Sequence, residues 1–232
     1  MTDSDLLRVM DATWPAAAYN RIGPWLIRTG AGGGKRVSAA SVAGDAQDIA
    51  QAVAAQQALG QKPLFLIRAQ DADLDRRLDA LGYQIVDPVV AYCAPVAQFS
   101  DQTTGKSYPH WPPLAIAREI WADAGIGPAR LQVMERAREK TAILVRHQDR
   151  VTGVAFVACA GDTAMLHALE VSPPHRRQGS AQNLLISAAN WAQRQGAVTV
   201  SLVVTTANTP ARALYDKMGM QMVGGYHYRQ KP

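Results

Sequence analysis

The chain has 232 residues, of which 48% are hydrophobic, with 24 Lys and Arg against 19 Asp and Glu. This hydrophobic content is enough for a packed core and excludes an intrinsically disordered chain. The net charge of +5 suits an anionic ligand, but the longest basic runs are pairs such as Lys35-Arg36 and Arg176-Arg177. The sequence therefore predicts a local phosphate site and no nucleic-acid partner.

The N-terminal segment M-T-D-S-D-L-L-R lacks the basic and apolar regions of a signal peptide. No apolar run reaches about 18 residues, the length that a membrane-spanning helix needs. We therefore expect a cytoplasmic protein with no membrane partner.

The first half is predicted to alternate short strands and helices. Trp25 to Arg28 and Arg36 to Val42 indicate a hairpin around the glycine-rich turn Gly30 to Gly34. The elements expected next are helix 45–59, strand 64–67, helix 72–81 and strand 83–93, which is broken at Pro88. The polar, proline-containing stretch 98–113 is the expected linker.

The second half is predicted to have the order ααβββαβαβ. The elements are helices 114–124 and 128–140, strands 142–146, 151–159 and 164–171, helix 180–195, strand 198–204, helix 208–218 and strand 220–228.

Two segments of the chain resemble each other, 64–86 and 200–223. L-G-Y-Q-I-V and M-G-M-Q-M-V place Gly82 opposite Gly219, an offset of 219 − 82 = 137 residues. This repeat matches Tyr215 with Leu78 and Asn208 with Asp71. The first copy is expected to keep its packing and to lack phosphate chemistry.

The stretch V-S-P-P-H-R-R-Q-G-S-A at 171–181 predicts an anion site. A β-rich run ends at Pro173-Pro174, which cannot continue a central strand. A basic turn with Gly179 follows, and then an amphipathic helix begins. The first turn of a helix has unpaired N–H groups and the positive end of the dipole, where a phosphate binds.

This turn resembles the acetyl-CoA pyrophosphate loop of the GNAT N-acetyltransferase superfamily, (Q/R)-x-x-G-x-(G/A), with Arg176, Gly179 and Ala181 at the matching positions. Together with the repeat, it resembles tandem GNAT proteins, in which a degenerate first half precedes an intact one. Such proteins often open with a hairpin and a basic pair that are loosely matched by Trp25, Arg28, Gly30, Gly32, Lys35 and Arg36.

The resemblance implies an α/β fold with two parts. Residues 108–232 would form a GNAT-like mixed twisted sheet flanked by helices, and residues 1–103 a smaller, degenerate GNAT-like domain. Acetyl-CoA would be the cosubstrate, and no metal is expected. The residues implied to contact acetyl-CoA are Leu169, Val171, Arg176, Arg177, Gln178, Gly179, Ser180, Ala181 and Asn208. Asn208 is also a favourable first residue for a helix.

The resemblance also implies catalytic residues. Tyr215, in the setting A-x-x-x-Y, would be the general acid that protonates the departing thiolate; alternatively it is a core tyrosine. His167, in H-A-L-x-V, matches a histidine of arylalkylamine N-acetyltransferases, and Glu170 is the second candidate base. Ordered water alone, with a structural His167, is the further alternative. Strand alternation puts His167, Leu169 and Val171 on one face and Glu170 on the other, unless a bulge intervenes.

The expected function is transfer of an acetyl group from acetyl-CoA to a primary amine, directly within a ternary complex. The acceptor would be a small-molecule or peptide amine, and the protein a monomer or homodimer. The alternative is a non-catalytic acyl-CoA-binding or sensing module. A nucleotide-triphosphate enzyme is disfavoured, because the glycine-rich run ending at Lys35-Arg36 is one residue short of G-x-x-x-x-G-K-(S/T) and has no Ser or Thr there. Tyr226, His227 and Tyr228 either line an acceptor pocket or form a plain edge strand.

Overall fold

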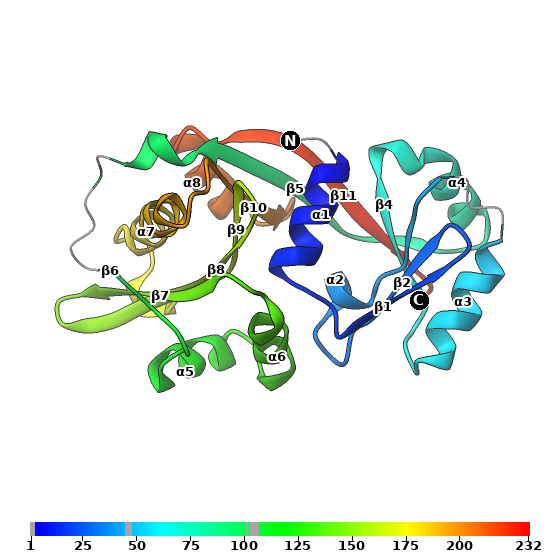
Figure 1. The fold of residues 1–232 in the computed structure, drawn as a ribbon, viewed down its shortest axis with the longest axis horizontal. Helices are drawn as coiled ribbons and strands as arrows, with labels where there is room; N and C mark the ends of the chain where they lie inside the picture. The colour runs from blue at the N-terminus through cyan, green and yellow to red at the C-terminus, as the bar shows by residue number, and fades with distance from the viewer. Residues whose placement is uncertain (1–2, 45–47, 101, 103–106) are drawn as a thin grey trace.

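The chain folds around one eight-stranded sheet that both halves of the sequence build together (Figure 1). The computed structural model describes residues 3–44, 48–100, 102 and 107–232. In spatial order the strands of this sheet are β4 (Leu64–Arg68), β11 (Gln221–Gln230), β5 (Gln84–Pro95), β10 (Thr199–Thr205), β9 (Thr163–Val171), β8 (Arg150–Ala160), β7 (Lys140–His147) and β6 (Ser107–His110).

A small separate sheet contains β1 (Ala18–Ile22), β2 (Trp25–Thr29) and β3 (Ser41–Val42). The helices are α1 (Asp3–Thr13), α2 (Lys35–Ser38), α3 (Ile49–Ala58), α4 (Ala72–Ala80), α5 (Ala115–Asp123), α6 (Pro128–Arg136), α7 (Ser180–Arg194) and α8 (Thr209–Lys217). Among the described residues, none of these helices combines the length and apolar character that crossing a membrane requires.

Two strands of the large sheet are interleaved between the halves. β11 lies between β4 and β5, and β5 lies between β11 and β10. The strand pairing follows the repeat. Tyr226 of β11 lies opposite Arg68 of β4. The positions that match these two residues in the other copy, Val89 (226 − 137) and Thr205 (68 + 137), also lie opposite each other. The predicted repeat is thereby confirmed. The last strand of each copy pairs with the first strand of the other copy.

Helices cover both faces of the sheet. α7 and α8 pack on one face, in a core that contains Leu184 and Tyr215. α5 and α6 pack on the other face around Trp121 and Phe156. α1 lies in the middle of the molecule, where Met10 packs with strands of both halves (Figure 1). β8 is buried on both faces, which explains why its sequence is almost continuously apolar.

Three predictions of secondary structure were wrong in detail. The predicted hairpin was right in that β2 pairs antiparallel with β3, Trp25 opposite Val42, but β2 also pairs with β1, and Lys35 begins the short helix α2 instead of a strand. Gly32 and Gly34 have φ values of +77° and +98°, which allow the chain to reverse into that helix. The segment expected as a linker contains the edge strand β6, although residues 101 and 103–106 of it lie outside the described residues. Pro88 does not break β5, because it lies beside a bulge at Asp87.

Candidate active site

The turn between β9 and α7 has the geometry of an anion site. After Val171 the chain makes a 3₁₀ turn, and Arg177 and Gly179 take left-handed φ values of +61° and +84°. Gly179 directly precedes α7, and no described side chain caps this helix. The first backbone N–H groups of α7 therefore have no partner within the helix and lie at the positive end of its dipole.

The side chains of this turn are arranged around its exposed outer surface. Arg176, Arg177 and Gln178 are exposed. The Nε of Arg176 donates a hydrogen bond of 3.1 Å to the carbonyl of Val171. Ser180 is buried, and its hydroxyl lies 3.0 Å from that of Thr152 on β8. The start of α7 is thus tied to the sheet while the two arginines stay available to a ligand.

The strands β9 and β10 separate beside this turn. Their parallel ladder ends where Leu166 lies opposite Leu202, although β9 continues to Val171 and β10 to Thr205. Past this point the backbone of Leu169 and Val171 has no β10 partner in the described ladder. A linear ligand that enters the gap meets backbone groups of β9 that have no β10 partner, although the Val171 carbonyl already accepts the hydrogen bond from Arg176.

A β-bulge interrupts β9 at the same place. β9 advances three residues, from His167 to Glu170, where β8 advances two, and Ala168 has φ +48°. Leu169 packs with the core under α7, whereas the His167 ring contacts aromatic rings on the opposite face. The expectation that His167 shares a face with Leu169 and Val171 was therefore wrong, because the bulge reverses the alternation and puts Glu170 on the side of His167.

Tyr215 lies on α8 with 7% of its surface exposed, and its ring is 5.6 Å from that of Tyr92. The structure gives its hydroxyl no hydrogen-bond partner among the described residues. Burial, and then the Glu170 and Tyr92 side chains, raise the pKa of Tyr215 to about 12. α8 is held by Asn208, whose side-chain oxygen accepts a hydrogen bond of 3.2 Å from Ala211 N. The Tyr215 hydroxyl is therefore protonated at neutral pH, as a general acid must be.

Glu170 is half-buried near the end of β9. Burial raises the pKa of its carboxyl group, and the positive charges of Arg176 and Arg130 act against this increase. A Cβ atom on Gly153 of the neighbouring strand would lie 2.8 Å from the Glu170 carbonyl oxygen, so only glycine allows β8 to come so close. A carboxylate with a raised pKa can accept a proton near neutral pH.

His167 is buried, with 5% exposure, and both of its ring nitrogens are engaged. Nδ1 lies 2.9 Å from Arg36 Nη1, and Nε2 lies 2.9 Å from the hydroxyl of Thr13, which donates to the Val9 carbonyl. Because arginine only donates, Nδ1 accepts and Nε2 carries the proton. Burial, followed by the charge of Arg36, holds the pKa of His167 well below 6.5. His167 is therefore a neutral imidazole.

A cavity of about 320 Å³ opens next to His167, on the sheet face opposite α7. Both halves contribute to it: Trp14, Lys35 and Arg36 come from the first half, while Ala168 and Thr205 come from the two separated strands. Tyr226 and Tyr228 of β11 complete the wall. The gap between β9 and β10 thus has the basic turn before α7 on one side and this cavity on the other.

The structure brings some of the predicted residues together and separates others. Tyr215 and Glu170 interact electrostatically across the gap. His227 points away from the cavity, because its Nε2 lies 2.8 Å from Asp75 on α4. Sequence reasoning gave no role to Thr13. The sequence feature that pointed to Arg36 was its place in the basic pair Lys35-Arg36, directly after the glycine-rich turn.

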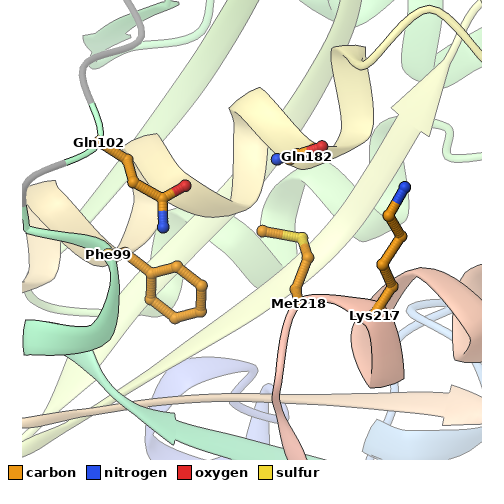
Figure 2. A pocket seen from close by; sticks show the side chains of 5 residues that line it. All are labelled: Phe99, Gln102, Gln182, Lys217 and Met218. Atoms are coloured by element: carbon orange, nitrogen blue, oxygen red, sulfur yellow. The ribbon is translucent and has the colours of Figure 1, made fainter.

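A second, smaller hollow lies on the α7 side (Figure 2). It has a volume of about 180 Å³, with Gln182 on α7 and Lys217 at the end of α8. Phe99 and Gln102, from the segment after β5, and Met218 form the rest of its wall (Figure 2). It brings one more cation, Lys217, to the side of the sheet that carries the basic turn.

The fold is a mixed α/β sheet flanked by helices, whose parallel strands β9 and β10 separate beside the uncapped start of α7. A sequence model described as acetyltransferase (GNAT) family matches residues 105–220. The chain belongs to this family and is an acyltransferase.

Similar proteins cover nearly the whole chain. An uncharacterized N-acetyltransferase, YobR of Bacillus subtilis, is 26% identical over 97% of this chain and 96% of its own length. A GCN5-related N-acetyltransferase from Kribbella flavida has a similar structure, with a TM-score of 0.71 at 17% identity over 100% of this chain and 96% of that one. A tandem GNAT protein from the clavulanic acid biosynthesis pathway has a similar structure, with a TM-score of 0.57 at 15% identity over 82% of this chain and 74% of that one. The GNAT fold predicted from the sequence is thereby confirmed.

Proposed function

We propose that the protein transfers an acetyl group from acetyl-CoA directly to a primary amine within a ternary complex. The observation that carries this proposal is the uncapped, basic start of α7 at the point where β9 and β10 separate. A pyrophosphate and a thioester arm need these two features next to each other.

The chain's own groups fit acetyl-CoA. The backbone amides from Gln178 to Ala181, with Arg176 and Arg177, would hold the pyrophosphate. The backbone of Leu169 and Val171, which has no β10 partner, would align the pantetheine arm, which acetyl-CoA extends toward the gap between the strands. Asn208 would contact the cofactor only in addition to its observed role, the cap of α8.

The acetyl group moves when the amine nitrogen forms a bond to the thioester carbon and the carbon–sulfur bond breaks. The Tyr215 hydroxyl would give its proton to the departing thiolate. The amine must lose a proton, and Glu170, through water, would accept it. His167 is less suited to this step, because Arg36 and Thr13 occupy its two ring nitrogens. We therefore assign His167 the role of positioning Arg36.

The acceptor amine would reach the thioester from the cavity beside Ala168 and Thr205. The pyrophosphate turn lies across the sheet, so the two substrates would not compete for space. This arrangement allows both to be bound at once, which is what direct transfer requires.

Calorimetric titration with acetyl-CoA tests the proposal, with the variant Arg176→Ala/Gly179→Asp as the matched control. Micromolar binding by the natural chain and its loss in the variant would support the assigned loop. Acetylated product from a panel of amines, identified by mass spectrometry, would then establish transfer. No binding at millimolar acetyl-CoA would refute the proposal.

A further inference from the structure

Arg36 is a cation without a counter-ion in the wall of the cavity. Its side chain is largely enclosed, with the guanidinium carbon 5.8 Å from the centre of the Trp14 ring and Nη1 bound to His167. Among the described residues no carboxylate forms an ion pair with it. An enclosed charge that lacks an opposite charge is costly, and a ligand anion would remove that cost.

The other charges of the cavity do not neutralise Arg36. Asp87 is the one acidic residue of the described wall, and its carboxylate already binds Lys35 Nζ at 2.6 Å. Arg130, whose guanidinium lies against Gly34, adds a second positive charge that has no ion pair among the described residues. The cavity therefore keeps a positive potential that favours an anionic ligand.

Two hydroxyl groups stand beside this charge. Tyr226 and Tyr228 line the same cavity, and their rings are 5.4 Å apart in an edge-to-face contact. Both hydroxyls interact with the Arg36 guanidinium, whose buried Nε has no hydrogen-bond partner among the described residues. Burial, and then Tyr226, raise the pKa of Tyr228 well above 10, so it stays a neutral donor. The tyrosine oxygens can accept hydrogen bonds from Arg36, but they are neutral and do not balance its positive charge.

From this geometry we infer that the acceptor is a small molecule that carries an anionic oxygen group, a carboxylate or a phosphate, in addition to its amine, and that Arg36 binds this group. The inference rests on the proposed function. The volume of about 320 Å³ lies at the lower end for ligand sites, which fits an amino acid or a compound of similar size. His167 orients the guanidinium through Nδ1, and the anionic group would anchor the acceptor while its amine faces the gap beside Ala168.

The experiment compares matched ligands on the protein saturated with CoA, by calorimetry. The pairs are each common amino acid with its amide, and phosphoethanolamine with ethanolamine, which separates carboxylate from phosphate. We expect the anionic member of at least one pair to bind at least tenfold more tightly than its neutral partner. Arg36→Gln should weaken that anionic ligand about 100-fold and the neutral one less than threefold. Arg36→Lys, which keeps the charge, should give an intermediate loss.

Arg21→Gln, which removes an exposed guanidinium from β1, is the matched control and should change neither affinity. If no anionic member binds more tightly than its partner, or if Arg36→Gln weakens both members equally, the inference is overturned. The acetyl-CoA affinity and the melting temperature are measured on each variant. Normal acetyl-CoA binding without anionic preference overturns this inference alone, whereas absent acetyl-CoA binding overturns the proposed function.

Discussion

The helices that precede the first strand of each copy, α7 before β10 and α3 before β4, begin in opposite ways. α7 starts after the exposed Gly179 and has no side-chain cap. α3 starts after Asp48, whose carboxylate accepts a hydrogen bond of 3.1 Å from Gln51 N. In the first copy a carboxylate thus occupies the helix start, where the second copy leaves its amides free for a phosphate.

The other matched positions of the first copy also lack the functional groups that the second copy has. Leu78 is the counterpart of Tyr215 and is fully buried, so it keeps the packing and has no proton to give. Asp71, the counterpart of Asn208, is buried in an ion pair with Arg68 at 2.8 Å. The first copy thus keeps the interactions that stabilise the sheet and has none of the groups that we assign to proton transfer or to the pyrophosphate.

Removal of the first copy should have the largest effect. In a fragment of residues 108–232, β11 would lose both neighbours, β4 and β5. We expect no cooperative thermal transition by circular dichroism and no acetyl-CoA binding, while the full chain shows both. A fragment that melts sharply and binds acetyl-CoA normally would show that the halves are independent domains.

Gly179→Asp gives α7 the kind of start that α3 has. The added carboxylate would satisfy the free amides and repel the pyrophosphate, so the dissociation constant for acetyl-CoA should rise about 100-fold by calorimetry. Gly179→Asn is the control, because asparagine tolerates a positive φ and has no charge. Equal losses in the two variants would attribute the effect to the backbone and not to the anion.

Tyr215→Phe removes the hydroxyl and retains the ring. The variant then has no hydroxyl at this position, like the first copy, which has Leu78 there. We expect kcat to fall about 100-fold with an unchanged acetyl-CoA dissociation constant. Because burial raises the pKa of Tyr215 to about 12, the natural chain should keep its acid protonated through pH 10. A pH profile of kcat that is identical in the two proteins would exclude Tyr215 as the acid.

Glu170→Gln tests the base by its pH dependence. A base works when it is ionised, and burial raises the pKa of Glu170 above its ordinary value of 4.5. The kcat/KM of the natural chain should therefore fall as the pH decreases through this raised pKa. Glu170→Gln should lower kcat/KM about tenfold near neutral pH and abolish that acidic limb. An acidic limb that persists in the variant would assign the base elsewhere.

Asp48→Ala should have the smallest effect and complete the comparison. Loss of the cap of α3 should lower the free energy of unfolding by about 1 kcal/mol in a urea titration. The acetyl-CoA dissociation constant should not change, because α3 belongs to the first copy, to which we assign no contact with acetyl-CoA. A weaker affinity in this variant would mean that the two helix starts are coupled.

Local patterns in the sequence predicted the parts of the site that depend on local structure. Pro173-Pro174, Gly179 and the amphipathic helix after them were enough to predict the turn before α7, because strand ends, glycine turns and helix starts are set by neighbouring residues. The family, the GNAT fold and the repeat were also predicted correctly. The roles of Tyr215 and the cofactor residues stay predictions.

The remaining features depend on residues that are distant in the sequence. The order β4-β11-β5-β10 follows from hydrogen bonds between strands of different halves, which no local pattern encodes. The bulge at Ala168 was considered as a possibility, but only the register with β8 fixes it. Thr13, Arg36 and His167 come from three separate segments, so their hydrogen-bonded chain was not visible in any one motif.

The interleaved sheet has a consequence for how the protein is made. Both neighbours of β5 lie in the second half, and β11 begins 221 − 84 = 137 residues after β5 begins. At a synthesis rate of about 5–20 residues per second, β5 waits roughly 7–27 s on the ribosome with exposed edges. Unpaired strand edges promote aggregation, so this interval is when a chaperone would protect the nascent chain.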